Sequence, residues 1–364
     1  MSIHILFIFA KNRKQNGQAE EKRIKYNSCR RKASGCEAGI CFSCSVNEQT
    51  SDEIGHGALK ARVCELKPEW KGMEIVMDSW SNVRTDLALE AREGIGESES
   101  GLHGVEVEEH YDEESDVHIT RVVIETKNGA KALGKPMGTY ITLEAPAMTE
   151  PEEDYHQEIS RILAEQLRGI LPNPDKEQSI LVVGLGNREV TADSLGPNVV
   201  DNLFVNRHIV LEYGKVAYNR TKMHLVSSLV PGVMAKTGME SAEIIKGVIG
   251  ETKPDLLIVI DALAARSTKR LNRTIQITNT GIHPGSGVGN HRNAITEETL
   301  HIPVLALGVP TVVDAATIVG DAMGERPATL KELNNMYVTT KDVDQQIRQI
   351  SHIICDGING ALNL

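Results

Sequence analysis

The chain has 364 residues, a net charge of −11 at pH 7 and 40% hydrophobic residues, which is ordinary for a globular protein of one or two domains. The negative charge argues against a general nucleic-acid binder, because binding to phosphates requires clustered Lys and Arg. No apolar run approaches the roughly 18–20 residues of a membrane span, and the apolar run at residues 3–10 lacks the flanks of a signal peptide, so a cytoplasmic protein is expected.

Residues 1–72 differ in composition from the rest of the chain. They are rich in Lys and Arg, show little helical or strand periodicity, and contain five of the six cysteines, Cys29, Cys36, Cys41, Cys44 and Cys64. We interpret this stretch as an unstructured or non-native extension. Translation that begins at Met73 or Met77, where the sequence becomes globular in character, is the alternative.

Three of these cysteines have a spacing that is typical of a metal-cluster site. Cys36, Cys41 and Cys44 form the C-x4-C-x2-C pattern of a plant-type iron–sulfur protein, in which the thiolates converge on one cluster. The flanking sequence, however, predicts no sheet that would hold such a loop. We therefore expect these cysteines to have no function, and an electron carrier is the alternative.

An acidic run follows at residues 93–116, which contain no Lys or Arg. Like charges repel one another and are usually solvated, so this run is predicted to be a mobile surface. Ordered structure is predicted to begin directly after it.

The pattern of apolar residues predicts alternating strands and helices from residue 117 to the C-terminus. Segments rich in Val, Ile and Thr predict strands at residues 117–126, 138–144, 179–183, 256–260, 273–278 and 304–307. Helical spacing predicts one helix that begins at Pro151, one that runs through Leu203, one at residues 241–250, and a C-terminal helix from Val343 to Ile358. This alternation implies an α/β fold, with a mostly parallel sheet covered by helices on both faces.

The strand predicted at residues 179–183 ends in the turn Gly184-Leu185-Gly186-Asn187. A strand that runs into Gly-x-Gly resembles a dinucleotide-binding fingerprint, but Glu189 occupies the place of the third glycine, and its carboxylate would repel a pyrophosphate. We expect instead a tight turn, in which the glycines allow a strand and a helix to pack closely.

Two aspartates that follow buried strands are the main candidates for chemistry. Asp193 lies in the turn or first helical residues after one strand, and Asp261 is placed at the end of the strand at residues 256–260. If these strands are neighbours in a parallel sheet, both carboxylates lie at the same edge. Two carboxylates held close cannot both ionise at low cost, so one can act as an acid and the other as a base on water. The alternative is that Asp193 caps a helix.

Other catalytic motifs are weaker or missing. The sequence has neither a G-x-S-x-G nucleophile elbow nor an H-E-x-x-H zinc helix. Cys355 lies within an apolar helical stripe and is expected in the core. The glycine-rich loop at residues 282–290, next to His291, either donates backbone N–H groups to an oxyanion or is a flexible connection.

From Asp78 to the C-terminus the sequence resembles the germination protease family, peptidase family A25, whose members degrade small acid-soluble spore proteins. The matching motifs lie at residues 83–88, 184–187 with Asp193 and 196–197, 259–264, 284–290 and 308–314. The fold of this family resembles that of hydrogenase-maturation proteases, in which the G-x-G-N turn and a later strand-end Asp lie at a metal-linked cleavage site.

The resemblance implies an endopeptidase that is made as an inactive zymogen, removes its own N-terminal segment, assembles as a homotetramer and acts in the spore interior during germination. Its substrates coat DNA, so direct nucleic-acid binding is not expected. The proposed catalytic pair of the family matches Asp193 and Asp261. Together with the composition, the resemblance implies an extension at residues 1–72, a propeptide at residues 73–86 and a catalytic domain at residues 87–364.

The mechanism that we favour needs no cofactor. One aspartate activates water against the peptide carbonyl and the other protonates the leaving amine, and which aspartate takes which role stays open. A metal bound by both aspartates is the alternative route. The alternative functions are a hydrogenase-maturation-type protease that trims a single metalloenzyme partner, and a non-catalytic binding protein.

The chain is predicted to cut itself between Asp86 and Leu87. Family substrates carry the recognition pattern Thr/Ser-Glu-Phe-Ala-Ser-Glu and are cut after the first Glu. Residues 85–90, Thr-Asp-Leu-Ala-Leu-Glu, repeat its order of hydroxyl, acid, large apolar residue, alanine, a variable residue and acid. The alternative is a chance hexapeptide at the start of a helix.

Overall fold

The computed structural model describes residues 85–93, 103–285, 292–323, 333 and 336–364. The chain divides into two units, Met1–Val76 and Met77–Leu364, and every described residue lies in the second unit. The extension at residues 1–72, its cysteine cluster and most of the expected propeptide therefore lie outside the described residues.

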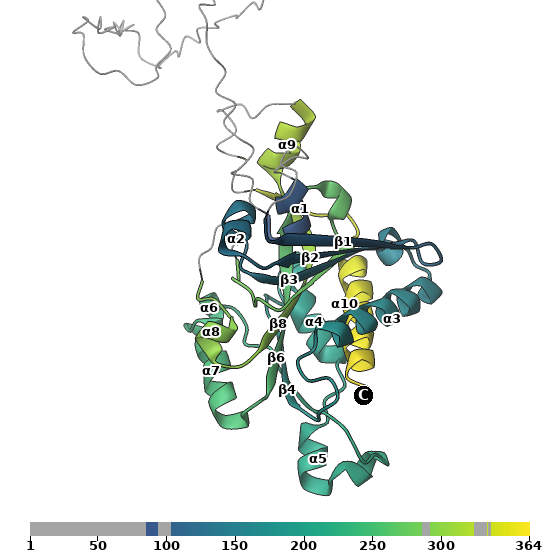
Figure 1. The fold of residues 1–364 in the computed structure, drawn as a ribbon, viewed down its shortest axis with the longest axis vertical. Coiled ribbons are helices and arrows are strands. Elements are labelled where there is room, and N and C mark those ends of the chain that lie inside the picture. Colours follow the sequence, from purple (N-terminus) through teal and green to yellow (C-terminus); the bar gives the residue numbers. More distant parts are fainter. Residues whose placement is uncertain (1–84, 94–102, 286–291, 324–332, 334–335) are drawn as a thin grey trace, which may run out of the picture. The chain divides into compact units, whose positions relative to one another are not determined.

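The described part of the chain is built around one nine-stranded sheet, in which eight strands have the order β1-β2-β3-β7-β8-β6-β4-β5 and β9 pairs with β8 (Figure 1). The strands are β1 (Val105–Asp112), β2 (Val117–Ile124), β3 (Gly138–Glu144), β4 (Ser179–Gly184), β5 (Leu225–Leu229), β6 (Leu256–Ala265), β7 (Thr274–Thr278), β8 (Val304–Asp314) and β9 (Tyr337–Val338).

The sheet is mixed rather than mostly parallel. Strands β8, β6, β4 and β5 are parallel neighbours, whereas β1, β2, β3 and β7 pair antiparallel with one another, and β7 and β9 pair antiparallel with β8. Strands β1 and β2 are antiparallel because a short turn joins them, and such a connection reverses the chain. The expected α/β class is confirmed.

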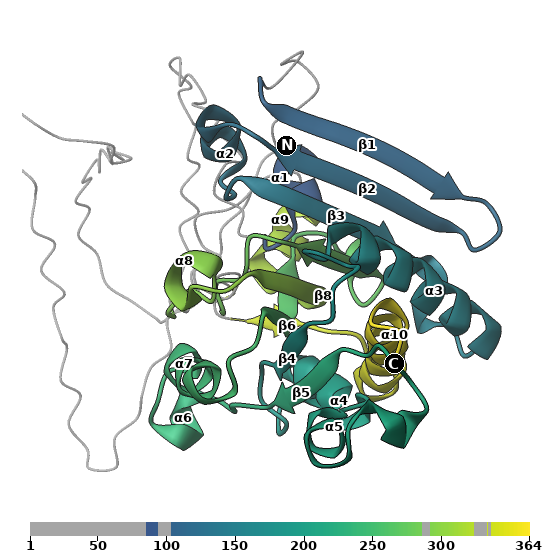
Figure 2. The ribbon, with the colours of Figure 1, turned by 60° about the horizontal axis from the view of Figure 1, so that its bottom comes forward.

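Helices cover both faces of the sheet, as expected (Figure 2). On one face lie α3 (Glu153–Ile170), α4 (Leu195–Asn202) and α10 (Val343–Ala361), and on the other lie α7 (Ser241–Thr252) and α8 (Glu297–Leu300). The remaining helices are α1 (Ala88–Glu93), α2 (Lys127–Leu133), α5 (Arg207–Tyr213), α6 (Met234–Thr237) and α9 (Ala315–Met323). Within the described ranges, none of the helices combines the length and apolar character that crossing a bilayer requires.

A third of the acidic run is a strand, so the prediction of a mobile surface was wrong there. Residues 105–112 form β1, which pairs with β2 along its whole length at the edge of the sheet. Val105 and Val107 pack against an apolar cluster that includes Val122 of β2. Acidic side chains occupy most of the exposed positions of β1. Charge on an edge strand prevents pairing with other chains, and here it concealed the strand in the sequence.

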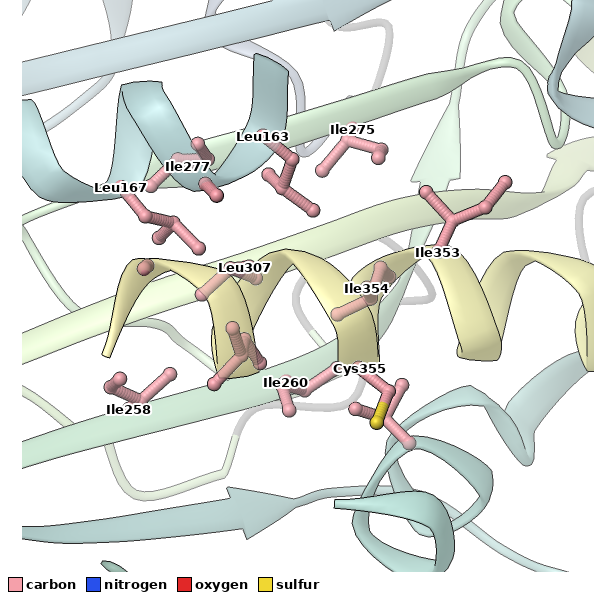
Figure 3. Packing of buried hydrophobic residues seen from close by; sticks show 14 of the residues in the cluster. Leu163, Leu167, Ile258, Ile260, Ile275, Ile277, Leu307, Ile353, Ile354 and Cys355 are labelled. Atoms are coloured by element: carbon pink, nitrogen blue, oxygen red, sulfur yellow. The ribbon is translucent and has the colours of Figure 1, made fainter. Parts of the chain in front are cut away.

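The main core lies between the sheet and the pair α3 and α10 (Figure 3). Along β6 the side chains alternate, so that Ile258 and Ile260 face Leu163 and Ile354 in this core, whereas Leu257 and Val259 face α7. Cys355 is buried in the same core, as predicted, and burial raises the pKa of its thiol to about 11.

We expect Leu163→Ala to destabilise the fold. The Leu163 side chain is fully buried and also fills the space beside Gly357 of α10, so truncation leaves a cavity that costs about 2–5 kcal/mol. Urea unfolding of the full chain measures the loss. Leu211→Ala is the matched control, since this helical leucine is 61% exposed. Equal stabilities of the two variants would contradict the described packing.

Candidate functional site

The turn that follows β4 packs closely against the backbone of residues 193–196. Gly186 has a φ of +116°, and a Cβ added there would lie 1.9 Å from the backbone oxygen of Asp193. A Cβ added at Gly184 would lie 2.2 Å from the backbone oxygen of Gly196. These contacts confirm the tight-turn interpretation of the Gly-x-Gly motif, because only glycine permits both the backbone conformation and the approach.

Asp193 lies in a single 3₁₀ turn, Thr191–Asp193, just before α4. Its Oδ2 accepts a hydrogen bond of 2.9 Å from the backbone N–H of Asn187, which fixes the carboxylate beside the glycine turn. The residue that precedes α4 is Ser194, so the alternative that Asp193 caps this helix is wrong.

Asp261 lies inside β6 rather than at its end. The strand continues to Ala265 because residues beyond Asp261 go on pairing with β8, where Asp261 itself is opposite Gly308. Strand β4, in contrast, stops at Gly184 opposite Ile260. The parallel neighbours β4 and β6 therefore bring the turn that carries Asp193 next to Asp261, which is the juxtaposition that the sequence predicted.

Both aspartates line one pocket of about 510 Å³. Other charged and polar side chains in its wall include Asp86, Lys135, Gln276 and Arg292. Residues 282–285 of the glycine-rich loop also line it, whereas residues 286–291 lie outside the described part of the chain.

The pKa values of both aspartates in the pocket are raised, so each carboxyl keeps its proton to a higher pH than usual. Asp261 is only 7% exposed, and burial raises its pKa well above the ordinary 3.8, with further increases from the negative charges of Asp193 and Asp86. Burial also raises the pKa of Asp193, while the hydrogen bond from Asn187 and the positive charge of Arg292 oppose that shift. The Asp261 carboxyl, more buried and facing two negative charges, is the one that retains a proton more strongly.

Asp86 of the predicted self-cleavage segment lines this pocket. The backbone N–H of Asp86 donates to the carbonyl oxygen of Ala264 at 3.1 Å, and the Asp86 carboxylate accepts from the N–H of Ala264 at 2.9 Å. The Leu87 side chain is fully buried in an apolar cluster with Leu263, Leu271 and others. Residues 85–87 therefore run beside the end of β6, and α1 begins directly after them.

The acidic end of the hexapeptide is also held. The Glu90 carboxylate is 3% exposed and accepts hydrogen bonds from the backbone N–H groups of Arg266 at 2.7 Å and Ser267 at 3.0 Å. The guanidinium of Arg270 lies 3.5 Å from it. The two acidic residues of the hexapeptide thus accept hydrogen bonds from backbone N–H groups, and its large apolar residue lies in an apolar cluster.

A metal bound by both aspartates needs further ligands beside them. In the part of the chain that the structure describes, no group of three or more His, Cys, Asp or Glu side chains is placed to hold a metal ion. Catalytic zinc sites use three protein ligands, so Asp193 and Asp261 alone do not fit such a site.

Two pocket residues, Lys135 and Gln276, were not found by sequence reasoning. Lys135 follows Gly134, which caps the C-terminus of α2 with a left-handed φ of 62°. No motif marks this lysine. Gln276 alternates with the core residues Ile275 and Ile277 in β7, and a long polar side chain on the second buried face of a strand is a signal that could have been used.

Comparisons with known proteins agree on one family. The sequence pattern of the family described as germination protease, Peptidase A25, matches residues 83–325. The germination protease of Caldanaerobacter subterraneus subsp. tengcongensis is 44% identical over 311 residues, which cover 77% of this chain and 94% of that protein. That of Clostridium perfringens (strain ATCC 13124) is 43% identical over 313 residues, covering 77% and 95%.

A further relative and a solved structure complete the comparison. The germination protease of Bacillus mycoides (strain KBAB4) is 47% identical over 248 residues, which cover 66% of each chain. Among solved structures, the [NiFe] hydrogenase maturation protease HycI from Thermococcus kodakarensis KOD1 matches at 14% identity and a TM-score of 0.29, covering 54% of this chain and 99% of that one.

Proposed function

The chain belongs to the germination protease family, and we propose that it is a self-processing endopeptidase that starts the degradation of small acid-soluble spore proteins in the germinating spore. One observation carries the proposal: residues 85–90 have the order of the substrate recognition pattern, and Asp86 of this segment lines the pocket that Asp193 and Asp261 share. An active site that holds its own substrate-like segment fits a zymogen that matures by cutting itself.

In the proposed reaction the two aspartates divide the proton transfers. Asp193, the less strongly shifted carboxyl, takes a proton from water, whose oxygen attacks the carbonyl carbon. The electron pair of the C=O bond moves to the oxygen. When the tetrahedral species collapses, the C=O bond reforms, the C–N bond breaks, and Asp261 gives its proton to the leaving nitrogen. The products are a carboxylic acid and an amine, and the proton now on Asp193 restores Asp261.

The experiment that tests the proposed function uses a small acid-soluble spore protein as substrate. We expect the self-processed chain to cut it after the first Glu of the Thr/Ser-Glu-Phe-Ala-Ser-Glu pattern, with equal rates with and without EDTA, as read by mass spectrometry of the fragments. The same substrate with that Glu changed to Lys is the matched control. An intact substrate would favour the alternative of a maturation-type protease, and a loss of cleavage in EDTA would favour the metal route.

We propose that residues 1–72 are dispensable. The family pattern begins at residue 83 and the second structural unit at Met77. A chain that starts at Met77 is expected to assemble as a homotetramer and to cleave substrate at the rate of the full chain, measured by light scattering and by fragment analysis. If the shortened chain is insoluble or inactive while the full chain works, the extension is structural.

Cleavage is expected to have a bell-shaped dependence on pH. The rate rises with pH as Asp193 ionises, and this limb lies above pH 3.8 because burial raises the pKa of Asp193. The rate falls again as pH passes the pKa of Asp261, which lies higher still. Circular dichroism at each pH separates titration from unfolding. A rate that stays constant on the alkaline side, while the fold is intact, would contradict the role of Asp261 as the acid.

A further inference from the structure

The carbonyl oxygen of Asp86 belongs to the peptide bond that the proposed function marks for self-cleavage, and two side chains donate hydrogen bonds to it. The Lys135 Nζ lies 2.9 Å from this oxygen and the Gln276 Nε2 lies 3.2 Å from it. The two donors come from different parts of the sheet, since Lys135 precedes β3 and Gln276 is in the middle of β7. A carbonyl oxygen has two lone pairs, so it can accept both hydrogen bonds at once.

Gln276 holds the segment on both sides of the marked bond. Its Nε2 donates to the carbonyl of Asp86, before the bond, and its Oε1 accepts from the N–H of Ala88 at 2.7 Å, after the bond. One rigid amide group therefore fixes the peptide at two points. This fixes the position and the orientation of the carbonyl that water would attack.

The sheet register places Gln276 and Asp261 in one row. Gln276 is opposite Gly308 of β8, and Gly308 is opposite Asp261 of β6, so the two side chains leave the same face of the sheet two strands apart. Two strand spacings are about 10 Å, which leaves room for one peptide between them. The segment that includes Asp86 and Leu87 occupies that face, where Leu87 packs against Leu263.

Lys135 adds a positive charge at the same oxygen. Its Nζ also bonds the carbonyl of Thr85 at 3.0 Å, which directs the ammonium along the segment. Burial lowers the pKa of this ammonium, and the negative charges of Asp86 and Glu90 oppose the shift. A cation in a poorly hydrated site interacts more strongly with developing negative charge than one in water.

We infer that Lys135 and Gln276 form the oxyanion-binding site of this protease: their N–H groups stabilise the negative charge that develops on the carbonyl oxygen preceding the cut bond. The inference rests on the proposed self-cleavage between Asp86 and Leu87. The same two groups would bind the equivalent carbonyl of a substrate protein, because the segment and the substrate share one recognition pattern. The glycine-rich loop at residues 282–290 is then not needed for this task.

The test measures the first-order rate of self-cleavage of the full chain. Lys135→Met removes the cation, and Gln276→Glu keeps the acceptor for Ala88 while it replaces the donor to Asp86 by a carboxylate. Each is expected to slow the cut about 10²–10³-fold, the usual effect of removing one oxyanion donor. Lys131→Met and Gln345→Glu, at exposed positions of α2 and α10, are the matched controls and should keep the normal rate.

A second measurement separates stabilisation of the oxyanion from simple anchoring of the segment. Hydrogen exchange at the amides of Leu87 and Ala88 in the uncut chain reports how firmly the segment is held. We expect Gln276→Glu to slow cleavage while this protection stays within about threefold of the normal value. Slow cleavage in proportion to lost protection would show anchoring only and overturn the inference.

The unchanged chain separates a failure of the proposed self-processing from a failure of the oxyanion-site assignment. If it does not cut itself between Asp86 and Leu87, the proposed self-processing fails and the inference fails with it. If it does cut there, and Lys135→Met and Gln276→Glu cut at the same rate, the proposed function stands and only the assignment of these two residues is overturned.

Discussion

Asp193→Asn and Asp261→Asn are each expected to abolish peptide cleavage while leaving the fold intact. Asn has nearly the shape of Asp but cannot exchange a proton near neutral pH. General acid–base catalysis contributes about 10²–10⁴-fold, so the rate should fall by at least that factor. The losses should not add in the double variant, because the two carboxyls act on the same bond.

The control for this pair is Asp201→Asn, which changes a half-exposed aspartate of α4 whose carboxylate pairs with Arg188. It should cut substrate at the normal rate. Cleavage is followed with a spore-protein peptide, and circular dichroism checks the fold. Near-normal activity of either active-site variant, with an unchanged spectrum, removes that residue from the mechanism.

Asp261→Asn should also raise stability at neutral pH. Since the pKa of Asp261 is raised by folding, the folded chain binds more protons than the unfolded chain between pH 3.8 and the raised value, so stability falls as pH rises across that window. Asn has no such dependence. Thermal unfolding at pH 4 and pH 7 measures the effect, and the melting temperature of the variant relative to that of the unchanged chain should be higher at pH 7 than at pH 4. A variant that is less stable than the unchanged chain at pH 7 would contradict a raised pKa of Asp261.

The second large effect concerns self-cleavage. The matured protein is expected to begin at Leu87, and Asp86→Ala is expected to slow maturation about 10–100-fold. The substitution removes the hydrogen bond from Ala264 to a carboxylate, and a hydrogen bond to a charged group contributes about 1.5–3 kcal/mol. N-terminal sequencing and gel electrophoresis over time measure site and rate.

Asp175→Ala is the control, because Asp175 is exposed in the loop before β4. A matured N-terminus other than Leu87 places the cut elsewhere. Normal processing of purified Asp193→Asn, alone in solution, would show that the cut does not need Asp193.

The parts of the fold that local patterns encode were predicted well. Strand β3 has the predicted bounds and the C-terminal helix begins at Val343, because β-branched runs and helical stripes are properties of neighbouring residues. The edge strand β1 was missed since its exposed side is acidic. Strand β6 was predicted too short, because its pairing with β8 beyond Asp261 depends on the partner strand.

The candidate site was predictable only in its parallel half. Asp193 and Asp261 were predicted because groups that follow neighbouring parallel strands gather at one edge of the sheet. The strands concerned, β4 and β6, were both recognisable in the sequence. Lys135 and Gln276 reach the pocket from the antiparallel half, where the place of β7 beside β8 is a property of the whole sheet. No spacing in the chain relates them to the aspartates.

The burial of Leu87 has a consequence for the direction of the reaction. Before the cut its nitrogen is a neutral amide that donates to the hydroxyl of Thr85, and its side chain lies in the apolar cluster with Leu263. Hydrolysis would turn that nitrogen into an ammonium ion, and an unpaired charge is strongly disfavoured in such surroundings. The new chain end would therefore be driven toward water, away from the carboxylate left on Asp86. Separation of the two ends would make maturation a one-way step, with no outside energy source required.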